Sequence, residues 1–262
     1  MPDTLVIERR AGVSHVTLNR PDSRNAMSLA MVDELIAALR AAEESGDRAI
    51  VLRGAGGHFC SGGDIKDMGA AQNAQAVAGV DPIAEVNARF GELCSAYAET
   101  GLPVVAVVEG AVMGGGFGVA CVADLVIAAP SAVFRLPETG LGLVPAQIAP
   151  FLVERLGFSE AKRLAVTGGK IDAHEALKLR LVHDVQPAET LDAALDAALA
   201  QIRKGAPQAI AATKALIRRA RLDDPGALVD DAAAVFAAAA RGPEGAEGMA
   251  AFLEKRPAKW VG

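Results

Sequence analysis

The chain has 262 residues, of which 52% are hydrophobic and only 4% aromatic, and its net charge at pH 7 is -6. This length supplies an ample core built from aliphatic side chains. The acidic balance excludes a general nucleic-acid binder, because such proteins display a basic excess. Glu109 and Asp124 interrupt the longest apolar runs before they reach the length of a bilayer span. We therefore expect a soluble, cytosolic protein with no membrane or nucleic-acid partner.

The first hundred residues alternate between strand-like and helix-like patterns. Residues 4–10 and 13–19 predict a hairpin around Ala11-Gly12, and Ser28 is a suitable cap for a helix reaching residue 45. Apolar spacing then predicts a buried strand over 49–53 and a helix over 83–100. Residues 69–81 carry few bulky or charged side chains, so we expect a mobile segment or lid there.

A buried strand and a glycine-rich turn dominate the middle of the chain. Residues 102–110 are almost entirely aliphatic, and Gly114-Gly115-Gly116 follow them directly before a helix-compatible stretch. Such a turn presents bare N–H groups that suit an anion or an oxyanion. A dinucleotide fingerprint is excluded because Val119 stands where its third glycine belongs, and a nucleoside-triphosphate loop lacks its lysine. Close packing of helix against strand remains the alternative.

A second strand, glycine turn and helix start occupy residues 49–65, about fifty residues before the first. Two such turns can aim two N–H donors at one developing oxyanion. Cys60 with His58 as its base is a weaker hypothesis, because both lie in one irregular loop with no third group to orient them. The three cysteines and four histidines show no metal-ligand or disulfide spacing, so we expect free thiols and no metal.

Glu138 lies in a loop, 137–142, between a strand expected over 132–136 and an apolar helix expected over 145–156. A carboxylate beside apolar walls has the raised pKa that a proton-transferring group needs. A helix cap or an ordinary surface carboxylate is the alternative.

The rest of the chain is predominantly helical. Helices are predicted over 159–166, 172–179, 191–204, 207–220, 227–240 and 244–255, with a last short strand within 181–185. We divide the chain into a β/α core, residues 1–200, and a helical C-terminal region, residues 201–262.

With these pieces placed, the chain resembles the crotonase superfamily, the enoyl-CoA hydratase/isomerase family. The order and spacing of several fragments carry the resemblance: Asn19-Arg20-Pro21 with Asn25-Ala26, residues 59–65, residues 110–121 followed by Asp124, residues 134–142, Leu181-Val182 and residues 252–256. The resemblance implies an α/β fold, a crotonase-type spiral of ββα units with a helical C-terminal region. It also implies trimers or dimers of trimers that bind an acyl-CoA thioester, with coenzyme A as part of the substrate and no separate cofactor.

The resemblance assigns roles residue by residue. The two amides that hold the thioester carbonyl map to Cys60 and Gly115, and Glu138 matches a catalytic glutamate. Arg24 and Ala26 match the loop that contacts the CoA nucleotide, and Phe252 and Lys255 match positions where a neighbouring subunit touches its adenine end. The remaining substrate-binding positions are Ser61, Gly62, Gly63, Asp64 and Ile65.

One departure from the family pattern bears on the mechanism. Hydratases of this family carry a second glutamate after the glycine turn, where this chain has Gly118. Glu109, Asp64 or a group of the substrate could substitute for it. Arg135, where relatives commonly have glycine, is a second departure. Phe117-Gly118 and residues 144–151 look most like hydratases of branched glutaconyl-CoA thioesters, the isohexenylglutaconyl-CoA and methylglutaconyl-CoA hydratases.

We therefore expect an enoyl-CoA hydratase that adds water to a 2-enoyl-CoA, with Glu138 handling the water and two amides stabilising the enolate. Isomerisation or decarboxylation on the same enolate platform is the enzymatic alternative. A crotonase-like protein that binds acyl-CoA without chemistry is the alternative from another class. The alanine-rich C-terminal helices bury little area by themselves, so we also expect a trimer or hexamer.

Overall fold

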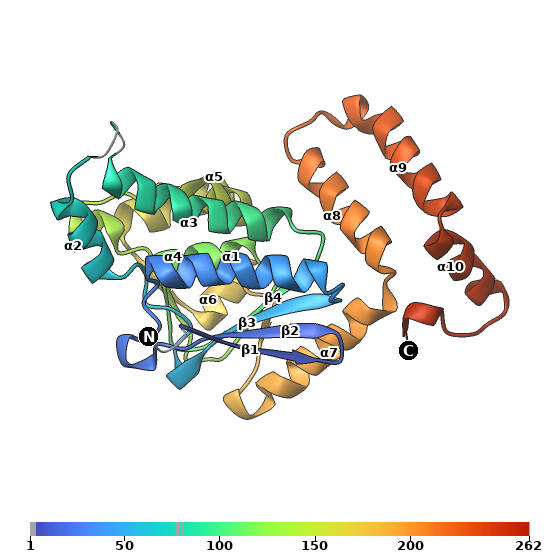
Figure 1. Ribbon diagram of the computed structural model, residues 1–262, viewed down its shortest axis with the longest axis horizontal. Helices are drawn as coiled ribbons and strands as arrows, with labels where there is room; N and C mark the ends of the chain where they lie inside the picture. Colours follow the sequence, from blue (N-terminus) through green and yellow to red (C-terminus); the bar gives the residue numbers. More distant parts are fainter. Residues whose placement is uncertain (1–3, 77–78, 80, 262) are drawn as a thin grey trace.

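The structure, a computed structural model, describes residues 4–76, 79 and 81–261. Its core is a six-stranded sheet with helices on both faces, and three C-terminal helices project away from it (Figure 1). The strand order is β1 (Leu5–Arg10), β2 (Val13–Leu18), β3 (Ala49–Gly54), β4 (Val104–Val108), β6 (Leu125–Ala128) and β9 (Asp184–Val185). The expected α/β fold is confirmed.

Only the first pair of strands in this sheet is antiparallel. β1 and β2 form the predicted hairpin, with Leu5 opposite Leu18 and positive φ angles at both Ala11 and Gly12 of the turn. The other neighbours pair in parallel, so each strand's carboxyl end reaches the same edge of the sheet. All five residues of β4 are buried, as its aliphatic run predicted, because helices cover both of its faces.

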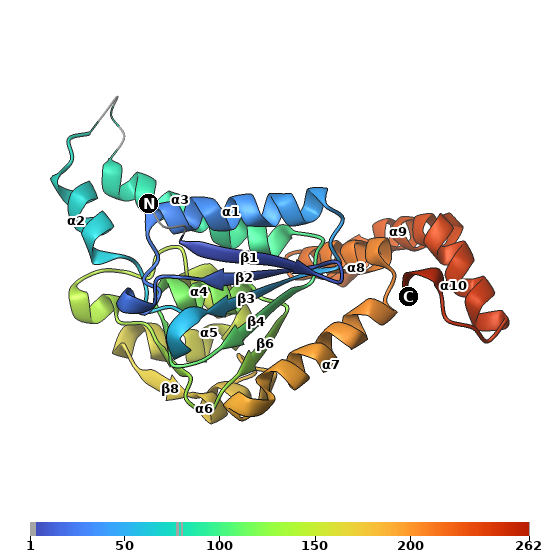
Figure 2. The same ribbon diagram turned by 60° about the horizontal axis from the view of Figure 1, so that its bottom comes forward.

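Two helical layers enclose the sheet (Figure 2). α1 (Leu29–Glu44) and α3 (Pro82–Glu99) cover one face, and α7 (Leu191–Lys204) covers the other through Leu191, Leu195 and Leu199. The Ser28 hydroxyl accepts a hydrogen bond from the Met31 amide and so caps α1 as predicted. The residue-200 boundary expected between core and C-terminal region falls inside α7.

A smaller sheet lies beside the first and orders its strands β5 (Ala111–Met113), β7 (Val133–Arg135) and β8 (Lys170–Asp172). α4 (Gly115–Val122) follows β5 directly, and every residue from Gly116 to Val122 is buried. The remaining helices of the core are α5 (Ala149–Thr167) and α6 (Ala173–Lys178).

The structure corrects three element predictions. The helices expected over 145–156 and 159–166 form one element, α5, which breaks at Gly157 with φ 73°. The segment expected to be a lid, residues 69–81, begins inside α2 (Ile65–Asn73), whose first turn is capped by Asp64. Residues 77, 78 and 80 of that segment lie outside the described residues. The strand expected within 181–185 shrinks to the two residues of β9.

We call α8 (Pro207–Ala220), α9 (Val229–Arg241) and α10 (Pro243–Leu253) the C-terminal arm. α8 and α9 have no buried residue. Arg48, which precedes β3, donates hydrogen bonds to the carbonyls of Gly205 at 2.7 Å and Trp260 at 2.9 Å, so it joins the chain end to the base of the arm. None of the helices described here is both long and apolar enough to cross a bilayer.

Candidate active site

The two glycine turns meet at the carboxyl end of the parallel strands. Residues 59 and 60 pair with the chain beside β5, where the Cys60 amide donates to the Ala111 carbonyl and the Met113 amide donates to the Cys60 carbonyl, both at 2.9 Å. A Cβ on Gly116 would lie 2.6 Å from the Cβ of Cys60, and one on Gly114 would lie 3.4 Å from the Cα of Gly62. Glycine at these positions is what lets the two turns touch.

The backbone N–H groups of Gly63 and Gly115 at this junction have no backbone acceptor among the described residues. The Gly115 amide opens α4, where the first turn of a helix leaves its N–H groups unpaired. The Gly63 amide lies between two bonded neighbours, because Gly62 accepts from Met27 and Asp64 donates to Met27. Gly63 is exposed and Gly115 half-buried, so neither residue is enclosed in the core. Such a pair suits an oxyanion.

The structure corrects the role expected for Cys60. Its amide is committed to the Ala111 carbonyl and the residue is fully buried, so it cannot donate to a thioester carbonyl. The unpaired amide of this loop belongs to Gly63. Burial also raises the pKa of the Cys60 thiol to about 11, and His58 Nδ1 accepts from the Ala111 amide. The hypothesis of a Cys60 nucleophile with His58 as base is therefore wrong.

Glu138 lies at the same junction. It begins the short 3-10 turn Glu138–Leu141, and its Oε1 is 2.9 Å from the position of a Cβ on Gly114. Its Oε2 is buried and has no hydrogen-bond partner within the part of the chain that the structure describes. Desolvation raises the pKa of this carboxyl, although its own backbone amide favours the charged form. A carboxyl with one unpaired oxygen and a raised pKa is suited to exchange protons with a substrate.

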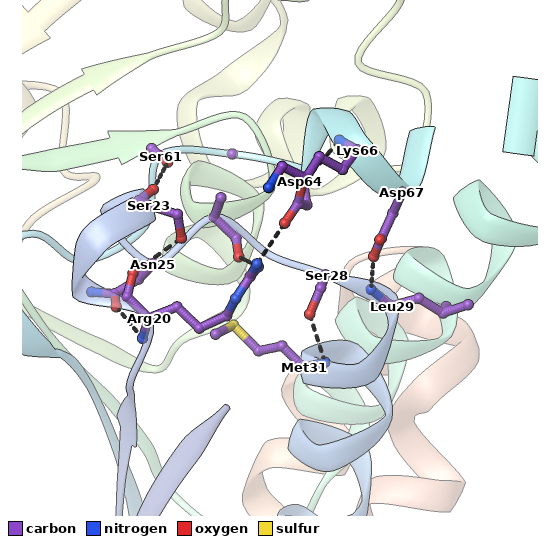
Figure 3. A network of polar contacts seen from close by, with 12 residues as sticks. Arg20, Ser23, Asn25, Ser28, Leu29, Met31, Ser61, Asp64, Lys66 and Asp67 are labelled. Atoms are coloured by element: carbon purple, nitrogen blue, oxygen red, sulfur yellow. Dashed lines mark hydrogen bonds and ion pairs between the residues drawn. The ribbon is translucent and has the colours of Figure 1, made fainter. Parts of the chain in front are cut away.

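A polar network fixes the loop before α1 against the second glycine turn (Figure 3). Arg20 Nη2 lies 2.7 Å from Asp64 Oδ2, and the Ser61 hydroxyl donates to the Ser23 carbonyl. Asn25 is fully buried and bonds to the Arg20 amide and the carbonyls of Ala55 and His58. The network places Ala26 and the exposed Arg24 beside Ser61, whose amide donates to the Arg24 carbonyl.

Asp64 is occupied by this network. Burial works against its ionisation, but Arg20 and the Lys66 amide outweigh it, so the pKa of Asp64 is lowered. Its Oδ1 accepts from Lys66 and caps α2. A carboxylate held ionised in this way is a poor substitute for the glutamate absent at position 118.

Apolar side chains surround Gly118 instead. A Cβ on Gly118 would lie 3.1 Å from Phe90 Cζ and 3.2 Å from Ile148 Cγ1. The same phenyl ring would lie 3.2 Å from a Cβ on Gly115. Phe90 and Ile148 were not among the predicted site residues. The available signal was the missing side chain at position 118, whose space another residue must fill.

Some predicted residues lie elsewhere. α10, which carries Phe252, lies on the opposite side of the molecule from α2 (Figure 1), and Lys255 follows α10 by two residues. Ile65 opens α2 next to Asp64 and is 74% exposed. Arg135 makes two hydrogen bonds near the glycine turn of residues 114–116. Its backbone carbonyl accepts from the Gly114 amide, and its side-chain Nε donates to the Gly168 carbonyl. Arg135 therefore braces the glycine turn through its backbone.

The sequence profile of the enoyl-CoA hydratase/isomerase family matches residues 8–262. The chain belongs to this family. A probable enoyl-CoA hydratase of Rhodobacter capsulatus is 35% identical to this enoyl-CoA hydratase/isomerase family member, over 99% of this chain and 98% of the relative. The 2,3-dehydroadipyl-CoA hydratase of Escherichia coli is 31% identical, over 98% of each chain.

Two solved structures are also similar to this chain. An enoyl-CoA hydratase/isomerase from Marinobacter aquaeolei has 52% identity and a TM-score of 0.95 over 99% of each chain. Pseudomonas aeruginosa AtuE has 52% identity and a TM-score of 0.94, over 99% of this chain and 100% of its own. The spiral fold and the acyl-CoA enzyme family expected from the resemblance are thus confirmed.

Proposed function

We propose that this family member adds water across the double bond of a 2-enoyl-CoA thioester. The observation that carries the proposal is the position of Glu138. Its carboxyl, whose Oε2 has no partner among the described residues, lies against Gly114, next to the free amides of Gly63 and Gly115. A general acid–base group beside an oxyanion site is the arrangement that addition to an unsaturated thioester requires.

The reaction follows from these three groups. The amides of Gly63 and Gly115 bind the thioester carbonyl oxygen, and the Glu138 carboxylate accepts a proton as the water oxygen bonds to C3. The electrons of the double bond move through C2 to the carbonyl oxygen as an enolate. Glu138, now protonated, returns its proton to C2 while the enolate collapses. One water is consumed, and the product is a 3-hydroxyacyl-CoA.

A single carboxyl performs both proton transfers in this scheme. Gly118 has no group to share the task, and Asp64 is held ionised by Arg20. The raised pKa of Glu138 supports the double role, because a carboxyl nearer neutrality both accepts and returns a proton more readily. Because one carboxyl takes the proton from water and returns it to C2, the oxygen and the proton add to the same face of the double bond. The addition is therefore syn.

The finer substrate that we propose is a branched glutaconyl-CoA. The pattern of Phe117-Gly118 with residues 144–151 supports it, as does the apolar surrounding of Gly118, which suits a branched carbon skeleton more than a second polar group.

We also propose that the enzyme is a cytosolic trimer or hexamer, in which Phe252 and Lys255 reach the CoA site of a neighbouring subunit.

The test is a product assay on a small panel of enoyl-CoA and glutaconyl-CoA thioesters with wild type and Glu138→Gln. We expect 3-hydroxyacyl-CoA from wild type, and turnover lower by about 10²- to 10⁴-fold in the variant with nearly unchanged binding. A shifted double bond or released carbon dioxide would instead indicate isomerisation or decarboxylation. Tight binding without any turnover would indicate the non-catalytic scaffold. Unchanged turnover in Glu138→Gln would remove Glu138 from the mechanism.

A further inference from the structure

We infer that Phe90 is a specificity-determining residue whose ring contacts the substituent on C3 of the acyl chain. The ring can do so because position 118 is glycine. The inference rests on the proposed function for the orientation of the thioester. It concerns a residue of α3, outside both glycine turns and the Glu138 loop.

The phenyl ring covers two glycines of α4 at once. Its Cζ would lie 3.1 Å from a Cβ on Gly118, and its Cε2 would lie 3.2 Å from a Cβ on Gly115. Positions 115 and 118 are three residues apart, so they share one face of the helix. At contacts this short, even a methyl group at either position would require the ring to shift by a few tenths of an ångström. Phe90 and the two glycines are therefore matched in shape.

The ring is beside the carbons that react. Gly118 is about 4.5 Å along α4 from Gly115, whose free amide binds the thioester oxygen in the proposed function. Successive carbons of the acyl chain are about 1.5 Å apart, so C2 and C3 lie within this span. Phe90 is only half-buried, so part of its ring remains available to a ligand. The Phe90 ring therefore lies beside the acyl chain at position 118, where other hydratases of the family have a glutamate carboxylate.

The backbone on both sides of Phe90 is fixed. Arg89 Nε lies 2.6 Å from Asp33 Oδ1 on α1, which joins the two helices. Gln147 Nε2 donates to Asn87 Oδ1 at 3.0 Å, and the Gln147 side chain fills the space over Gly91. Ile148, which follows Gln147, is the second side chain over Gly118. The ring is thus preorganised, as a specificity-determining surface should be.

The test compares the equilibrium binding of 3-methylbutyryl-CoA and butyryl-CoA, which differ by one methyl group on C3. Neither has a double bond, so their affinities are measurable even if the proposed hydration fails. We expect wild type to bind the branched thioester about fourfold more tightly, the value of one buried methyl group. Phe90→Ala should bring the ratio close to one, and Phe90→Leu should leave an intermediate ratio.

Gly118→Ala tests the pairing with Phe90, and Gly69→Ala is its control, since a Cβ on Gly69 of α2 meets nothing within 4 Å. As a single substitution, Gly118→Ala should displace the Phe90 ring and so reduce the ratio of the affinities for the branched and unbranched thioesters. When Phe90→Ala is already present, Gly118→Ala should not change this ratio further. A merely structural Phe90 would lower stability and leave the ratio unchanged. The inference would be overturned if the ratio of the two affinities were the same in wild type, Phe90→Ala and Phe90→Leu. It would also be overturned if wild type bound both thioesters equally well.

Discussion

The Oε1 atom of Glu138 lies 2.9 Å from the point where a Cβ on Gly114 would stand. Gly114 has φ 49° and ψ -117°, a backbone conformation that residues with a side chain rarely adopt. The absence of a side chain at position 114 therefore serves two purposes. It permits the turn, and it leaves the carboxyl its place beside the free Gly115 amide.

Gly114→Ala should consequently impair catalysis more than stability alone explains. The new methyl group would push the Glu138 carboxyl from the junction, and we expect kcat to fall by at least about 10²-fold, the scale of lost general acid–base catalysis. Gly46→Ala is a matched control, because Gly46 also has a positive φ but a Cβ there meets nothing within 4 Å. Steady-state kinetics on both variants checks this. Similar losses in kcat would argue against displacement of Glu138.

The activity should depend on the ionisation of Glu138. Desolvation raises the pKa of this carboxyl above its ordinary 4.5, and the reaction begins with the ionised form. The profile of kcat/KM against pH should therefore fall on the acid side with a midpoint above 4.5. A midpoint at or below 4.5 would mean that another group controls this limb. The measurement should use a substrate whose own groups do not titrate in this range.

The same raised pKa has a consequence for stability. Because the folded state favours protonated Glu138, its stabilising contribution is complete below the unfolded pKa and is lost as pH rises through the folded pKa. Glu138→Gln should match wild type in acid and become more stable than wild type at neutral pH. The gain should be at most about 1 kcal/mol, since partial exposure screens the charge. Urea unfolding at several pH values measures it, and a pH-independent difference would contradict the explanation.

Asn25 should be among the costliest polar side chains to remove. It is fully buried, its amide donates to the carbonyls of Ala55 and His58, and its oxygen accepts from the Arg20 amide. Asn25→Ala leaves these groups unpaired, so we expect a loss of about 3 kcal/mol in the free energy of unfolding and weaker thioester binding. Asn73→Ala, which removes one exposed bond to Gly69, should change stability by less than about 0.5 kcal/mol. Equal effects in urea titrations would contradict this ranking.

The C-terminal arm should be covered in the assembled enzyme. Phe236, Phe252 and Leu253 are 75%, 83% and 79% exposed, which is high for large apolar side chains. We expect sedimentation to give a trimer or hexamer, and Phe236→Glu to shift it toward smaller species. Removal of residues from Gly242 onward should loosen CoA-ester binding in calorimetry. A stable wild-type monomer that binds CoA esters normally would exclude the neighbouring-subunit role of Phe252 and Lys255.

The sequence predicted elements best where local chemistry determines them. The bounds of α7 and α8 agree to the residue with 191–204 and 207–220, because Gly205 and Pro207 interrupt two strongly periodic stretches. The hairpin and the two glycine turns were also predicted. β8, three residues long, was missed because it has too few positions to show alternation and depends on pairing with β7.

The site was predictable in outline but not in its contacts. Glu138 and Gly115 could be selected from the sequence, and the structure places both at the junction of the turns. The amide of Cys60 could not be judged, because its availability depends on pairing with the distant Ala111 carbonyl. Phe90 matched the apolar face of its helix, and a periodic pattern does not distinguish a core residue from one beside a ligand.

Arg48 also bears on the order of biosynthesis. Its side chain is made early in translation, but it binds the carbonyl of Trp260, which lies 212 residues later in the sequence. The sheet, both glycine turns and Glu138 all precede the arm in the chain, and domains generally form from the N-terminal side as they emerge. The catalytic centre can therefore be complete while the arm is still unanchored. The Arg48 bond to Trp260 can form only after residue 260 has emerged, so anchoring of the arm is one of the last steps by which this chain folds.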